Sequence, residues 1–138
     1  MSARRLLIAF AFANAVVYSL LTPLWEGFDE PFHFAYVQQL ANGQGLPDPR
    51  TARLSNEVGT SFLLAPASPV IQLNWPEVTS YSQYFSWPAS TRAEIRQRLE
   101  GIPLGLRWRP SQMPNYEAHQ APLAYLLLAV PERLLARV

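Results

Sequence analysis

The sequence predicts a mainly α-helical membrane protein fragment. We expect a first transmembrane helix, a long extracytoplasmic loop with amphipathic helices, and the start of a second transmembrane helix. Three observations support this class: an uninterrupted apolar run near the N-terminus, helical spacing of apolar residues in the middle, and a second apolar run at the end. The corresponding divisions are 1–25, 26–119 and 120–138.

Composition excludes several other classes. The 138 residues are 49% hydrophobic and 12% aromatic, whereas disordered chains are poor in aromatics. The formal net charge of +1 gives no electrostatic footprint for nucleic acid. The absence of cysteine excludes a disulfide framework, a thiolate metal site and a cysteine nucleophile.

The first expected element is the apolar run Leu6–Trp25, which contains no ionisable group. About 20 such residues span the hydrocarbon core, and a soluble core helix would need a polar stripe. Arg4 and Arg5 precede the run, so the positive-inside rule predicts a cytoplasmic N-terminus and an extracytoplasmic loop. A cleaved signal peptide is the alternative, but Leu24, Trp25 and Glu26 make a poor cleavage site. We therefore expect an uncleaved helix in the inner or plasma membrane.

Two helices are predicted within the loop. The first has Asp29 as its N-cap, an acidic residue and a proline in its first turn, and Gly43 as its C′ glycine. The second begins at a capping-box pattern, Thr91–Glu94, and ends near Gly101.

Proline density predicts ordered loop between these helices, including the aromatic stretch 74–88. Its aromatic side chains lie either on the bilayer interface or in a small loop core, and the sequence alone favours neither reading.

The last element is the apolar run 121–130, interrupted by Pro131 after ten residues. A ten-residue helix reaches about 15 Å, half of a bilayer core. We interpret residues 120–138 as the start of a second transmembrane helix in a truncated chain.

Two polar groups flank the loop. Asp29 and Glu30 are adjacent carboxylates, and Asp29, His33 and Tyr36 share one helix face through their i, i+4, i+7 spacing. Carboxylates at a membrane interface can act as a general base or bind a cation. The alternative is that the acidic pair only stabilises the helix start, worth about 1 kcal/mol.

The second polar group is the segment 116–123, YEAHQAPL. Membrane re-entry is expected to bring Glu117 and His119 towards the acidic pair. Two carboxylates and two imidazoles could hold a divalent metal, although no tight ligand spacing is present. A polar collar that caps the second helix is the alternative. No Ser-His-Asp order, phosphate-binding glycine loop or dinucleotide fingerprint occurs.

The segment 25–36, WEGFDEPFHFAY, follows a basic N-terminus and one apolar helix. It resembles the first luminal loop of GT-C membrane glycosyltransferases, which include the family 39 protein mannosyltransferase type and its bacterial relatives. The segment 116–128, YEAHQAPLAYLLL, resembles their second landmark, usually written with two prolines before Leu-Tyr-Tyr. Here Ala121 replaces the first proline and Ala124 the first tyrosine. The two segments occur in the family's order and bracket essentially the whole chain.

The resemblance implies the N-terminal part of a multi-pass membrane enzyme. Such an enzyme transfers a sugar from a polyprenyl-phosphate donor to an extracytoplasmic glycan, lipid or protein acceptor. It implies Asp29 as the catalytic base with Glu30 beside it. The residues expected to bind substrate are His33, Tyr36, Glu117 and His119.

Several questions stay open. A divalent metal is possible but not assigned, and Arg107 or Arg109 could stabilise the leaving phosphate. Family members carry further donor-binding loops beyond position 138, so the chain alone is expected to be inactive. The alternatives are a non-catalytic, membrane-anchored binding module and a small exported domain released by signal cleavage.

Overall fold

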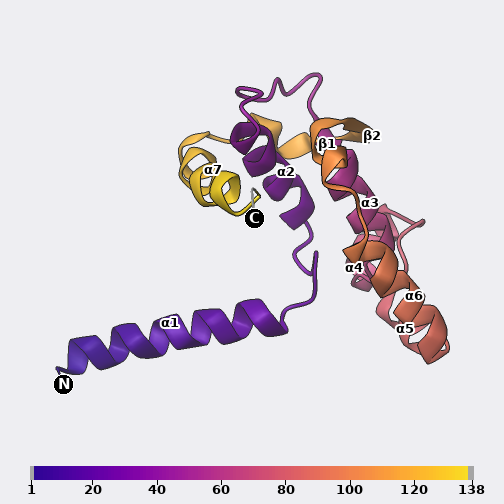
Figure 1. The fold of residues 1–138 in the computed structure, drawn as a ribbon, viewed down its shortest axis with the longest axis horizontal. Coiled ribbons are helices and arrows are strands. Elements are labelled where there is room, and N and C mark those ends of the chain that lie inside the picture. Colours follow the sequence, from indigo (N-terminus) through magenta and orange to yellow (C-terminus); the bar gives the residue numbers. More distant parts are fainter. Residues whose placement is uncertain (1, 137–138) are drawn as a thin grey trace.

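The computed structural model describes residues 2–136 and is mainly helical (Figure 1), as the sequence predicts. The elements follow one another in this order: α1 Ala3–Leu21, α2 Glu30–Ala41, β1 Arg53–Ser55, α3 Asn56–Leu64, α4 Pro69–Asn74, α5 Tyr81–Ser86, α6 Ala89–Glu100, the 3₁₀ helix η1 Leu104–Trp108, β2 Pro110–Pro114, the 3₁₀ helix η2 Tyr116–His119, and α7 Leu123–Leu135.

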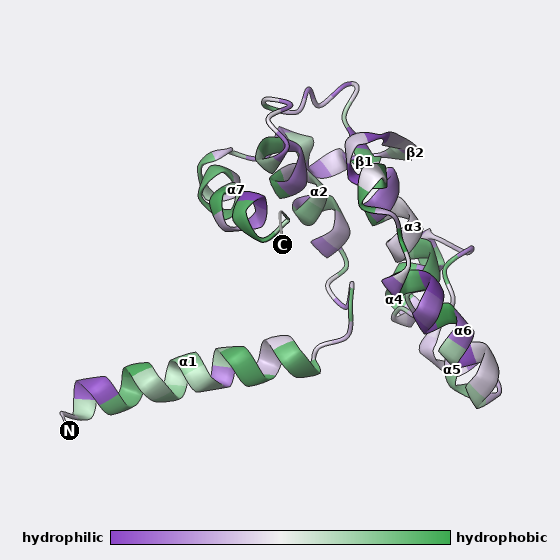
Figure 2. Ribbon diagram, in the orientation of Figure 1, coloured by the Kyte–Doolittle hydropathy of each residue, from purple (hydrophilic) through white to green (hydrophobic). Residues whose placement is uncertain are grey.

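Helix α1 projects away from the other elements and is apolar over most of its surface (Figures 1 and 2). It is long and apolar enough to span a membrane, and none of its residues is buried. The helix ends at Leu21, four residues earlier than the apolar run predicts. The reason is Pro23, which has no amide hydrogen to continue the helical ladder.

Trp25 belongs to the core formed by the residues after α1 and not to the apolar helix α1. Its backbone φ is 62°, a value rare for a bulky residue, and only 6% of its surface is exposed. Its indole Nε1 donates to the Ser61 Oγ at 3.1 Å. The chain turns at this residue, and the indole enters the core. The predicted division 1–25 therefore includes four residues, 22–25, that lie beyond the end of α1.

The core lies among α2, α3 and α4. Phe32 is fully buried at its centre, with its ring centroid 6.2 Å from Phe62, 6.0 Å from Trp75 and 4.1 Å from Tyr116. Smaller apolar side chains fill the remaining space: Ala35, Leu54, Val58, Ala65, Ala67, Ile71 and Val78. Of the two alternatives for the aromatic stretch 74–88, packing in a small core is therefore correct for Trp75. The aromatics of α5 stack instead on one another, and Phe85 is 66% exposed.

The helix boundaries show which local signals decide. Gly43 adopts φ +73° after α2, as the predicted C′ glycine should, and Gly101 ends α6. The predicted capping box at Thr91 is wrong, because α6 begins at Ala89, directly after Pro88.

The stretch predicted as ordered loop contains helix α5. This helix has a complete capping box: the Gln83 amide donates to the Ser80 Oγ, and the Ser80 amide donates to the Gln83 side chain. Helices α3 and α4 were also not predicted. Each is shorter than ten residues, so its apolar residues repeat over too few turns to predict a helix. Burial of side chains such as Phe62 and Ile71 holds these helices in place.

The two strands close the loop on itself. β1 pairs antiparallel with β2, with Arg53 opposite Pro114 and Ser55 opposite Pro110. The prolines tolerate this position because β2 is an edge strand. The pairing returns the end of the loop to its beginning, near α2.

Helix α7 packs along α2, where Tyr125 and Ala129 contact Val37 and Ala41 (Figure 1). The helix does not end with the apolar run at Val130, because it continues through Pro131 to Leu135. An ion pair of 2.7 Å between Arg107 and the adjacent Glu132 holds that last turn in place. The leucines of α7 that face away from α2 are exposed. With 13 residues, about 20 Å long, α7 is shorter than a bilayer core.

Two matched phenylalanine truncations test this core. We expect Phe62→Ala to lower the free energy of unfolding by about 3–5 kcal/mol, because it leaves a cavity against Phe32 and Trp75. Phe85→Ala removes the same atoms from an exposed side chain and should cost less than about 1 kcal/mol. Denaturant unfolding of the full chain in detergent micelles measures both. Equal losses would contradict the placement of Phe62 at the centre of the core.

Candidate functional site

Three titratable side chains from the two ends of the loop meet at the start of α2. The side chains are Asp29, His33 and Glu117, and one ligand atom of each lies within 4.8 Å of the others. The Nε2 of His33 is 3.2 Å from the Asp29 Oδ2, and its Nδ1 is 4.0 Å from the Glu117 Oε2. We call this group the acid–histidine cluster.

The core positions Glu117. The buried side chain of Asn115 donates to the Phe32 carbonyl at 3.1 Å and accepts from the Glu117 amide at 3.1 Å. The carboxylate then accepts from the Gln120 side chain at 2.9 Å. Because Phe32 precedes His33 directly, one bridging asparagine brings Glu117 beside that imidazole.

Asp29 lies at the N-cap position of α2, but its side chain makes no capping hydrogen bond. The capping alternative predicted such a bond to the amides of the first turn. The carboxylate instead pairs with His33, one helical turn further on, and half of its surface (51%) is exposed. Asp29 is therefore the member of the cluster that solvent or a substrate can reach most easily.

His33 connects the exposed carboxylate to a tyrosine on α7. Its Nδ1 is 2.7 Å from the Tyr125 hydroxyl. In the neutral imidazole with a proton on Nε2, Nε2 donates to Asp29 and Nδ1 accepts from Tyr125. If His33 takes a second proton, its positive charge faces the carboxylates of Asp29 and Glu117. These hydrogen bonds link Asp29, His33 and Tyr125 in one chain that orients the Asp29 carboxylate.

Stacked tyrosines form the wall beside His33. The rings of Tyr36 and Tyr125 are 4.1 Å apart and nearly parallel, at 10°. The Tyr36 hydroxyl donates to the Gln120 carbonyl at 3.4 Å, and burial raises the pKa of Tyr36. Burial, together with the negative charges of Glu117 and Asp29, raises the pKa of Tyr116 to about 12. These phenols stay protonated near neutral pH and serve as hydrogen-bond donors.

The structure brings together four of the six predicted site residues. Asp29, His33 and Glu117 form the cluster, and Tyr36 joins it through its stack on Tyr125.

Glu30 and His119 lie outside the cluster. The Glu30 Oε2 accepts from the Gly27 amide at 3.3 Å and closes the turn before α2. His119 is exposed at the end of η2 and belongs to no cluster of possible metal ligands within residues 2–136. The predicted pairing of two imidazoles is therefore wrong, because the 3₁₀ turn directs Glu117 inwards and leaves His119 at the surface.

Sequence reasoning missed Asn115, Gln120 and Tyr125. Tyr125 carried a readable signal, since it is the one residue with a hydrogen-bonding side chain in the apolar run 121–130. Asn115 and Gln120 have no such signal in the sequence. Asn115 acts through a hydrogen bond to Phe32, 83 positions away, and Gln120 through a hydrogen bond to Glu117 within a local turn.

The cluster offers donor atoms that a divalent cation accepts. One imidazole nitrogen and two carboxylate oxygens suit Mn²⁺ or Zn²⁺. Ligands on one such ion, at bond lengths of about 2.1 Å, are roughly 3 Å apart, so the present atoms must approach one another. Glu117 would also exchange its bond from Gln120 for the metal. The donor set fits a cation once these side chains rearrange.

No known protein family, curated protein or solved structure matches this chain. The acid–histidine cluster is therefore interpreted from its own geometry.

The two histidines give an internal test of cation binding. We expect Mn²⁺ titrated into the full chain in micelles to broaden the imidazole NMR signals of His33 well before those of His119, because only His33 has two carboxylates nearby. Glu117→Gln should remove this difference, whereas Glu94→Gln, on exposed helix α6, should leave it. Simultaneous broadening of both histidines in the unmodified chain would exclude a cation site at the cluster.

Proposed function

We propose that this chain is the first membrane helix and first extracytoplasmic loop of an integral-membrane glycosyltransferase. The enzyme transfers a sugar from a polyprenyl-phosphate donor to an acceptor outside the cytoplasm. One observation carries the proposal: the two segments that resemble GT-C landmarks, 25–36 and 116–128, contribute to one site. They are about 80 residues apart in sequence, yet Asp29 and His33 meet Glu117 and Tyr125.

The membrane arrangement rests on α1. Its length, its apolar surface and the absence of buried residues suit a helix surrounded by lipid. Arg4 and Arg5 hold its start in the cytoplasm, and residues 26–119 then lie outside. In this arrangement the exposed leucines of α7 face lipid or further membrane helices.

In the proposed reaction Asp29 is the base. Its exposed carboxylate accepts the proton of the acceptor hydroxyl while that oxygen attacks the anomeric carbon of the donor sugar. The bond between the anomeric carbon and the phosphate oxygen breaks, and the polyprenyl phosphate leaves with the electron pair. His33 orients Asp29 through Nε2 and is itself fixed by Tyr125. His33 and Tyr125 are thus positioning residues.

The leaving phosphate needs a cation, and the arginines considered for this role are distant from Asp29. Arg107 contacts Asn42, at the far end of α2, through Nε at 3.1 Å. Helix α2 has 12 residues and is about 18 Å long, so Arg107 and Asp29 lie at opposite ends. Within residues 2–136 no arginine forms an ion pair with Asp29 or Glu117, and the cation would be a metal or come from outside the segment.

A non-catalytic, membrane-anchored binding module is the second candidate. The observation that favours it is that each member of the cluster already has a partner within the chain, as expected of a purely structural network. The two candidates differ in what Asp29→Asn does to sugar transfer.

Topology can be tested by fusions. We expect alkaline phosphatase fused after Gly45 to be active and fused after Arg5 to be inactive, because only the first reporter would lie outside the cytoplasm. Enzyme activity in intact bacterial cells is the readout, with immunoblots to equalise expression. A mature N-terminus near residue 26 would contradict a retained membrane helix.

The role of Asp29 can be tested by Asp29→Asn in the complete open reading frame expressed in membranes. Sugar transfer from a polyprenyl-phosphate donor should fall by roughly 10² or more, since an amide cannot accept the proton. Stability should change by less than about 1 kcal/mol, because the pair with His33 is half exposed. Asp48→Asn, an exposed aspartate in the loop after α2, is the matched control and should retain full activity. A stable Asp29→Asn protein with unchanged turnover would end the catalytic assignment.

A further inference from the structure

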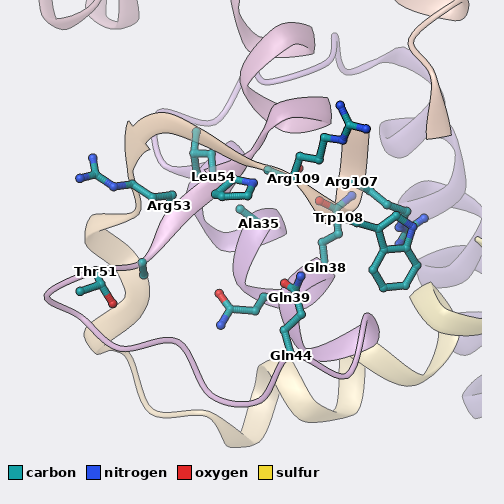
Figure 3. Close-up of a pocket in the computed structure, with 13 residues that line it drawn as sticks. Ala35, Gln38, Gln39, Gln44, Thr51, Arg53, Leu54, Arg107, Trp108 and Arg109 are labelled. Atoms are coloured by element: carbon teal, nitrogen blue, oxygen red, sulfur yellow. The ribbon is translucent and has the colours of Figure 1, made fainter. Parts of the chain in front are cut away.

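A second site lies on the face of α2 opposite the acid–histidine cluster. It is a cavity of about 360 Å³ between α2, the loop that follows it, β1 and the η1–β2 connection (Figure 3). Its volume is in the range of small-molecule sites. We call it the arginine cavity, after the three arginines among its lining residues: Arg53, Arg107 and Arg109.

The cavity carries uncompensated positive charge, since no acidic residue lines it. Arg107 is buried and its charge is balanced by Glu132 at 2.7 Å. Arg53 donates to the Gln112 carbonyl, a neutral group. The Arg109 side chain is exposed and makes no ion pair or hydrogen bond with any of residues 2–136. Figure 3 shows the Arg53 and Arg109 side chains extending in opposite directions, so they do not share one anion, and Arg109 is the guanidinium group available to a ligand.

A buried polar group in the wall lacks a partner. Gln38 is 1% exposed, and its Nε2 donates to the Glu57 carboxylate at 2.7 Å. That bond fixes the orientation of the amide, and the Oε1 is left with no donor in the described part of the chain. A buried carbonyl without a donor is costly, but this oxygen is fully covered, so a ligand hydroxyl reaches it only after the Gln38 side chain moves.

The other lining residues suit a hydroxylated ligand. The side chains of Gln39, Gln44 and Thr51 offer both donors and acceptors, as ring hydroxyls require. Trp108 lies at the edge with 54% of its surface exposed, so its ring can cover the apolar face of a small ring.

We propose that the arginine cavity binds an anionic sugar, a monosaccharide that carries one phosphate or carboxylate. Arg109 binds the anionic group, Trp108 packs against the sugar ring, and the side chains of Gln39 and Gln44 bind its hydroxyls. The inference rests on the cavity alone and does not depend on the proposed transfer reaction, because Asp29 lies at the other end of α2.

Calorimetric titration of the full chain in detergent micelles tests the site. The probes are glucose 1-phosphate, glucose, inorganic phosphate and a short-chain prenyl phosphoryl glucose. We expect glucose 1-phosphate to bind saturably and at least about tenfold more tightly than glucose or inorganic phosphate. Among these three probes it alone has both an anionic group for the arginine and a sugar ring for Trp108. Tighter binding of the prenyl derivative, with the same dependence on Arg109, would identify the ligand as a lipid headgroup.

Variants assign the binding to this cavity. Arg109→Gln should weaken glucose 1-phosphate binding roughly tenfold without loss of stability, since this side chain has no ion pair or hydrogen bond within residues 2–136 to lose. Arg96→Gln, an exposed arginine on α6, should have no effect. Trp108→Leu should weaken binding of glucose 1-phosphate but not of inorganic phosphate.

Three outcomes would overturn the proposal. They are an absence of saturable binding by every sugar probe, equal losses in the Arg109 and Arg96 variants, and equal affinities for inorganic phosphate and glucose 1-phosphate. Asp29→Asn should leave this binding intact, so failure of the site and failure of the transfer reaction are distinguishable.

Discussion

The burial of Phe32 is the constraint on which the rest of the structure depends. Its ring contacts Phe62 of α3, Trp75 after α4 and Tyr116 of η2, so one side chain joins three segments that are distant in sequence. Its backbone carbonyl accepts from Asn115, which in turn holds Glu117. The core and the acid–histidine cluster are therefore built on the same turn of α2.

Helix α2 then separates two chemically different surfaces. One face and the N-terminal end carry Asp29 and His33, where two carboxylates surround an imidazole. The opposite face, with Gln38, lines a cavity in which arginines are in excess. An acidic surface near the N-terminal end of α2 and a basic cavity further along give one helix two separate electrostatic environments.

Helix α7 completes both surfaces from the end of the chain. Tyr125 supplies the hydrogen bond to His33, and Glu132 neutralises the buried Arg107 beside the cavity. A buried guanidinium without that carboxylate would be strongly destabilising. Contacts of α7 with α2 and η1 thus pair polar groups and bury apolar ones, which explains why a helix with a leucine-rich outer surface keeps a defined position.

Local signals were read correctly where one residue type decides. The apolar composition of α1, the Pro31 start of α2 and the glycine ends at Gly43 and Gly101 all follow from properties of single residues or short runs. Errors occurred where two local signals competed. At Thr91 a capping-box pattern competes with the proline before Ala89, and at Pro131 the helix continues although the apolar run ends.

The sequence by itself determined the mainly helical class, the apolar N-terminal helix and the placement of Asp29, His33 and Tyr36 on one helix, because each depends on spacing within a few turns. Only the tertiary structure decided that Glu117 joins them while Glu30 and His119 do not. It also decided that Trp25 is buried in the core, and that arginines from β1 and η1 line one cavity with Gln38. These outcomes rest on contacts between residues that are distant in sequence, and hydrophobic burial around Phe32, not local spacing, selects them.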